Sequence, residues 1–223
     1  MKTFQLWIYL FILGSFNSLF SQEGVGNEMI FQQFEKGTVI FKDGRRSSAS
    51  LNYDMIQQQM LFMGNDSTIM KITNFLDISV VIIGERRFLP VSTQGVFYEE
   101  IPIGNNSFFV QRKAFIVSAG KATPYGGYSQ TQSSTSFGSW SDKVRSSENP
   151  TPNEKLKLDI RCIYYLKISD SYKKFLSAKT LRKLFKGHES EIEKYANEQS
   201  IDFSKTDDVA RIVEYGYSLI SNK

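Results

Sequence analysis

A succession of short strand-forming segments, separated by turn signals, is the feature that most constrains the fold of this chain. Between residues 37 and 119, runs of β-branched and aromatic residues recur at roughly 8–12 residues per strand. The segment 37–42 is the clearest run, and Asp43-Gly44 follows it as a hairpin signal because glycine accepts a positive φ. No interval here is long enough for regular crossover helices, so a parallel sheet is not expected. We predict an antiparallel β meander, built as a sandwich or a partly closed barrel.

The period of the apolar residues changes after Leu176, and the end of the chain predicts helices. Ser177 can cap a short helix that ends at Gly187, and apolar stripes predict two further helices over residues 189–199 and 207–220. Short one-sided helices do not stand alone. We therefore predict an α+β, mainly β fold: a β-rich domain over residues 22–176, with a C-terminal segment of two or three short helices, 177–223, packed on it.

A low-complexity stretch interrupts the strand pattern over residues 120–154. It is rich in Ser, Gln, Thr and Gly, cannot build a core, and is interpreted as a long mobile loop. Its aromatic residues could stack on a sugar or a peptide, or they could simply pin the loop to the sheet, which is the interpretation we favour. These candidate loop aromatics are Tyr125, Tyr128, Phe137 and Trp140.

The first 21 residues have the layout of a secretory signal peptide. Lys2 precedes an apolar run over residues 4–13, and the small residue Ser21 marks the expected cleavage point. The run is too short for the ~20 residues that span a bilayer, although an uncleaved anchor is an alternative. We expect an exported protein, in the periplasm or on the cell surface, with no transmembrane helix in the mature chain.

The inventory of chemically reactive residues is small. One Cys and one His exclude a disulfide scaffold, a Cys/His zinc site and a catalytic centre that needs two histidines. His188 is interpreted as a solvated residue at a helix start rather than a ligand. Glu99 and Glu100 are adjacent in a strand, so their carboxylates should face opposite sides. We predict no catalytic, metal or cofactor site, no cofactor, and no enzymatic activity.

The charge distribution gives the best indication of a binding surface. The chain has 27 basic and 23 acidic residues, and a net charge of +4 implies no nucleic-acid partner by itself. Residues 155–188 hold ten basic and two acidic residues, whereas residues 189–214 hold eight acidic and three basic ones. The basic segment could dock on an acidic partner or a membrane surface. Alternatively, the basic and acidic helices neutralise each other, which is the commoner arrangement. The candidate patch is Lys173, Lys174, Lys179, Arg182, Lys183 and Lys186.

Several short segments carry a diffuse resemblance. They include residues 37–44, Leu51-Asn52-Tyr53, Phe97-Tyr98-Glu99, Tyr164-Tyr165 and Asp207-Asp208-Val209. With them the chain resembles uncharacterised exported β-rich proteins of the Gram-negative envelope. The resemblance implies a β-rich envelope protein and carries no established activity or functional residues.

Two functions follow from these observations. The leading hypothesis is a non-enzymatic exported envelope protein that binds another envelope component, with an envelope protein as a possible partner and peripheral membrane contact also possible. The alternative is a carrier of a small apolar or glycan ligand inside the β domain, suggested by the meander and the 14% aromatic content. A hydrolase lacks a placed acid–base pair, and the helical C-terminus does not fit an outer-membrane barrel.

Overall fold

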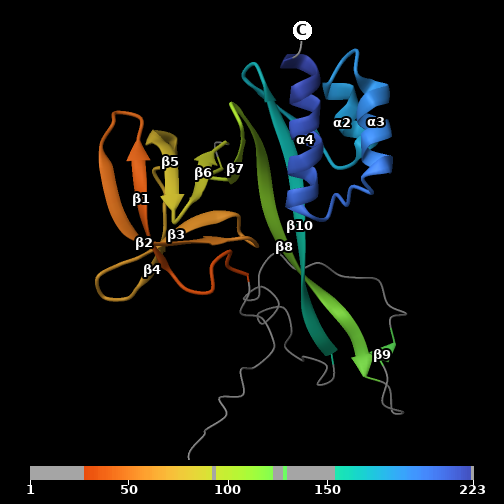
Figure 1. Ribbon diagram of the computed structural model, residues 1–223. Helices are drawn as coiled ribbons and strands as arrows, with labels where there is room; N and C mark the ends of the chain where they lie inside the picture. Colours follow the sequence, from red (N-terminus) through yellow and green to blue (C-terminus); the bar gives the residue numbers. More distant parts are fainter. Residues whose placement is uncertain (1–27, 92–93, 123–127, 130–153, 222–223) are drawn as a thin grey trace, which may run out of the picture.

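One antiparallel sheet organises the residues that the computed structural model describes, which are 28–91, 94–122, 128–129 and 154–221 (Figure 1). Within these residues, ten strands are hydrogen-bonded in the order β11-β10-β8-β7-β6-β5-β1-β2-β3-β4, and a short β9 pairs with β8. The prediction of a mainly β antiparallel meander with C-terminal helices is confirmed, and the sheet curls without closing. The strands are β1 Glu35–Phe41, β2 Arg46–Asp54, β3 Gln59–Met63, β4 Ile69–Lys71, β5 Ile78–Ile83, β6 Arg86–Pro90, β7 Phe97–Ile103, β8 Asn106–Ala122, β9 Tyr128–Ser129, β10 Glu154–Ile168 and β11 Ser171–Phe175.

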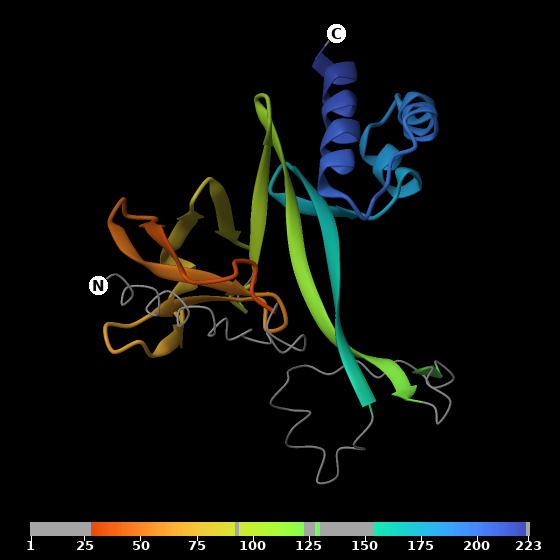
Figure 2. The same ribbon diagram turned by 60° about the horizontal axis from the view of Figure 1, so that its bottom comes forward.

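The strand order departs from a simple meander at one place. The chain leaves β4 at the edge of the sheet and returns as β5, which pairs with β1 rather than with β4. The connection contains the 3-10 turn η1, Phe75–Asp77. Strands β1–β6 consequently curl around a shared interior (Figure 1), whereas β8 and β10 form a long two-stranded ribbon (Figure 2).

Two apolar cores lie along the sheet. The first core fills the curled part, where Leu51, Val81 and Phe88 are almost fully buried. The second core joins the ends of β7, β8, β10 and β11 to the helices, through residues such as Phe108 and Ile212. Both cores use inward positions of β7 and β8, so these two strands connect the two halves of the molecule.

The C-terminal helices cover one end of the long ribbon (Figure 1). They are α2 Ala178–Leu181, continued by the 3-10 turn η2 Arg182–Leu184, then α3 Glu189–Glu198 and α4 Thr206–Ser221. The Ser177 N–H donates to the Thr180 hydroxyl at 3.1 Å, which is one half of a capping box. Gly187 then ends the turn with a φ of +85°, a conformation that favours glycine. The apolar periodicity in the sequence thus located α3 and α4 to within one residue at each end, whereas the first predicted helix is a four-residue α-helix continued by a 3-10 turn.

Two predicted segments fall mostly outside the described residues. The signal-peptide interpretation concerns residues 1–21, which are not among them. Within the predicted loop, 120–154, β8 continues to Ala122 and Tyr128–Ser129 pair with it as β9. Tyr125, Phe137 and Trp140 lie outside the described residues, and Tyr128 is placed by its backbone pairing alone.

Gly216 of α4 packs closely against Phe185, the residue that follows η2. A Cβ at this position would lie 2.5–2.8 Å from three ring atoms of Phe185, which is 1% exposed. We expect Gly216→Ala to lower the free energy of unfolding by up to about 2 kcal/mol. The cost of overpacking, about 1–3 kcal/mol, outweighs the roughly 1 kcal/mol gained in helix propensity.

Urea denaturation of the two single variants and the double variant checks this expectation. In a Phe185→Leu background the smaller side chain removes the clash, so the same Gly216→Ala change should become neutral or stabilising. A Gly216→Ala protein more stable than the wild type would contradict the packing described here.

Candidate functional site

A basic hollow lies where β11, the η2 turn and the end of α4 meet. Its volume is about 530 Å³. Its lining combines three lysines with a histidine and three apolar side chains: Lys173, Lys183, Lys186, His188, Ile168, Leu184 and Ile220. Ile168 and Ile220 are 41% and 50% exposed, so the apolar part of this surface is open to a partner. We call this surface the basic hollow.

The structure brings together half of the patch predicted from the sequence. Lys173, Lys183 and Lys186 line the basic hollow, whereas Lys179 does not. Lys174 points away because side chains alternate along β11: Lys173 shares its face with Phe175 of the helical core, and Lys174 shares its face with Tyr172. Tyr172 packs edge-on against Phe109 on the other side of the sheet.

Neutralisation between the basic and acidic segments is only partial. Arg182 pairs with Glu193 of α3, which is the arrangement expected if the two segments neutralise each other. Three of the eight acidic residues instead pair within their own segment: Glu198 with Lys194 at 3.8 Å, Asp202 with Lys205 at 3.9 Å, and Asp208 with Arg211 at 2.8 Å. Across the described residues, no ion pair involves any of the three lysines of the basic hollow. Their charge is therefore directed to solvent or to a partner.

His188 lies at the start of α3 and contributes to the basic hollow. Its side chain is only 15% exposed, which differs from the solvated residue expected from the sequence. Its Nδ1 atom is buried without a hydrogen bond to the described residues, 3.5 Å from the Glu191 carboxylate. The His188 ring thus forms part of the wall rather than a free surface group.

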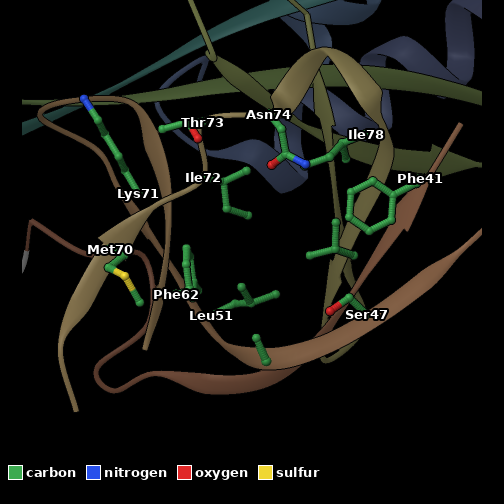
Figure 3. Close-up of a pocket in the computed structure, with 12 residues that line it drawn as sticks. Phe41, Ser47, Leu51, Phe62, Met70, Lys71, Ile72, Thr73, Asn74 and Ile78 are labelled. Carbon is green, nitrogen blue, oxygen red and sulfur yellow. The ribbon is translucent and has the colours of Figure 1, made fainter. Parts of the chain in front are cut away.

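A second cavity lies inside the curled part of the sheet (Figure 3). Its volume is about 560 Å³, and we call it the β1–β5 cavity. Leu51 and Phe62 line one side, Phe41 and Ile78 another, and Ile72 closes it from the β4–β5 connection (Figure 3). The remaining lining residues are Val39, Ser47, Ala49, Met70, Lys71, Thr73 and Asn74.

The meander pattern and the aromatic content suggest an apolar cavity in the β domain but identify none of its residues. The available signal lies in β2, where the inward positions 47, 49 and 51 are Ser, Ala and Leu. Small side chains at successive inward positions leave volume that large ones would fill. The opposite wall could not be identified in this way, because β5 reaches β1 through a non-local connection.

A buried carboxylate lies between the two cores. Glu99 of β7 is 4% exposed, and both of its oxygens are bound by arginines. Arg86 donates to them at 2.5 and 2.9 Å, and Arg112 donates at 2.6 Å. Burial alone would raise the pKa of Glu99, but the hydrogen bonds and charges of the two arginines outweigh it and lower the pKa below its usual range.

This arrangement makes Glu99 a structural ion rather than a proton donor. Glu100, its neighbour, faces the other side and pairs with Arg87 at 2.8 Å, as strand alternation predicts. Cys162 is a partly buried free thiol next to the cluster, 3.4 Å from Arg112 Nη1. Among the described residues, no group of three or more His, Cys, Asp or Glu side chains is placed to hold a metal ion.

Comparison with protein-family models, curated proteins and solved structures gave no match to this chain. The helices of the described part of the chain are all too short or too polar to cross a membrane. Function is therefore inferred from the geometry of the two cavities and their surroundings.

The lysines of the basic hollow should cost stability rather than provide it. We expect Lys183→Gln to raise the free energy of unfolding by up to about 0.5 kcal/mol at low salt, because it relieves repulsion among like charges. Arg182→Gln is the matched control, since it removes the ion pair with Glu193 and should lower the same quantity.

Urea denaturation at low and at about 1 M salt measures both effects. High salt should remove the gain from Lys183→Gln, because screening acts over only ~3 Å at that concentration. A clear loss of stability in Lys183→Gln at low salt would show that this lysine is paired within the fold.

Proposed function

We propose that this protein is a non-enzymatic exported envelope protein that binds another envelope component through the basic hollow. The observation that carries the proposal is the combination of three lysines without an ion pair in the described residues and an exposed apolar lining. Unpaired lysines beside exposed apolar side chains do not stabilise the fold. A partner that covers the lysines and the apolar side chains together gains binding free energy from both. The export part of the proposal rests on residues 1–21 of the sequence.

The chemistry of the hollow favours an acidic protein surface as the partner. Positive charge around the rim attracts acidic groups and orients the encounter. The hollow itself accepts a protruding apolar side chain against Ile168, Leu184 and Ile220, which is how interface anchors are commonly seated. A bilayer presents a flat surface to such a hollow, so a protein partner fits it better.

Two observations support a binding role over catalysis. The most buried acidic side chain, Glu99, is held ionised by two arginines and has no free oxygen to offer a substrate. The Nδ1 atom of His188 is buried and lies 3.5 Å from the carboxylate of Glu191. Among the described residues, no further side chain joins this pair to form the set of interacting groups that catalysis requires.

Site-specific photo-crosslinking in the native envelope tests the proposal. A crosslinking residue placed at Ile220 lines the hollow, and one placed at Leu176 has a similar exposure, 46% against 50%, but does not line it. We expect one discrete protein adduct from position 220 and none from position 176.

Reversing the charge of the three lysines tests whether they are required for the crosslinked adduct. The combined change Lys173→Glu, Lys183→Glu and Lys186→Glu should reduce its yield at least about tenfold, because three attractive contacts become repulsive. Lys174→Glu should leave the yield unchanged, because this residue lies on the opposite face of β11. An adduct that persists through the triple reversal, or an adduct with lipid alone, would overturn the proposal.

A further inference from the structure

The β1–β5 cavity has the dimensions and composition of a small-molecule site. Its volume of about 560 Å³ falls within the ~300–1,000 Å³ that such sites occupy. Its walls come from the five strands β1–β5 and from the β4–β5 connection, so it belongs to the architecture of the curled sheet rather than to one loose loop. The apolar part of the lining is Val39, Phe41, Ala49, Leu51, Phe62, Met70, Ile72 and Ile78.

Polar groups gather at one edge of this cavity. The amide of Asn74 lies between Ile72 and Ile78 at the edge formed by the β4–β5 connection, next to Thr73 (Figure 3). Neither side chain forms a hydrogen bond with another described residue, and both are exposed at the rim. Lys71 lies beyond Thr73 on the outer side of this edge, with its ammonium group directed away from the cavity (Figure 3), and it has no ion pair among the described residues. Thr73 and Asn74 supply hydrogen-bond donors at the edge of the cavity, and Lys71 places one positive charge outside it.

Exposed apolar side chains continue from the cavity onto β4. Met70, which lines the cavity, is 41% exposed, and its neighbour Ile69 is 56% exposed. β4 is the edge strand of the sheet and does not pair with β5. Because β4 and β5 do not pair, an apolar chain that enters between them breaks no strand pairing.

We propose that the β1–β5 cavity binds a single-chain amphiphile, with its hydrocarbon chain among the apolar walls and an oxygen-rich head group at Thr73 and Asn74. The donors at the rim and the positive charge outside it complement a carboxylate or an ester, and the apolar lining complements the chain. This site is separate from the basic hollow, which is formed by the C-terminal segment, so it stands whether or not the proposed function holds.

Calorimetric titration of the purified full-length protein with decanoate, dodecanoate and tetradecanoate tests the proposal. Below the micellar concentration of each compound, we expect saturable binding to one site. Each loss of two methylenes should weaken binding roughly tenfold, because their burial is lost. Absence of saturable binding, or an affinity that does not depend on chain length, would overturn the proposal.

A matched pair of variants locates the binding. Ser47 lines the cavity and Ser48, its exposed neighbour, lies on the outer face of β2. Ser47→Phe should reduce the affinity for dodecanoate at least about tenfold, whereas Ser48→Phe should leave it unchanged. Because both positions are exposed, neither change disturbs the buried core.

Two further variants keep the test decisive. Ala49→Leu extends a side chain into the cavity from the next inward position, and it replaces Ser47→Phe if that variant does not fold. Asn74→Ala should weaken dodecanoate binding several-fold while preserving the dependence on chain length, since it alters the rim alone. Wild-type affinity in Ser47→Phe or Ala49→Leu would place the bound chain elsewhere and refute the assignment.

Discussion

The rest of the structure depends on one buried ion cluster, Glu99 with Arg86 and Arg112. Alternate residues of β7 share one face of the sheet, and on that face Glu99 lies between Phe97 of the first core and Ile101, which packs against the helical core. On β8, Arg112 likewise lies between Val110 of the helical core and Ala114 of the first core. A buried carboxylate is costly unless it is paired, so the sheet must hold β6, β7 and β8 in one register to bring both arginines to it. Arg86 also packs over the rings of Phe31 and Phe88, at 5.1 and 5.5 Å, which ties the cluster to the first core.

This cluster separates two surfaces with different chemistry. The curled strands enclose the β1–β5 cavity, whose lining is mostly apolar, and the helical end carries the basic hollow. Because β7 and β8 pass through both halves, the two sites belong to one continuous sheet rather than to independent modules. On the opposite face, stacked Tyr98 of β7 and Tyr165 of β10, with ring centroids 4.6 Å apart, join these two strands across β8. The protein thus combines a mostly apolar cavity in the curled sheet with a basic surface at the helical end.

Local sequence patterns predicted most of the strands and helices. The features that these patterns did not predict depend on pairing between segments that are distant in the sequence. Hairpin signals and apolar periodicity depend on neighbouring residues, so they identified the meander and all three helices. Charge alone grouped Lys173 with Lys174, although strand alternation already places them on opposite faces of β11. The convergence of Lys173 with Lys183 and Lys186 required the helices to be placed. The β1–β5 cavity depends on the pairing of β5 with β1. The burial of Glu99 depends on the register of β6, β7 and β8, and neither property is encoded in a single segment.

The most direct test of the account compares Glu99→Gln with Glu100→Gln by urea denaturation. Both glutamates lie on β7, and each pairs with an arginine thirteen residues earlier. The side chain of Glu99 is 5% exposed and that of Glu100 is 19% exposed, and only Glu99 forms ion pairs with two arginines. We expect Glu99→Gln to lower the free energy of unfolding by about 3 kcal/mol, because it leaves two arginines facing a neutral amide. Glu100→Gln should cost less than about 1 kcal/mol. Equal losses in the two variants would contradict the central role given to the buried cluster.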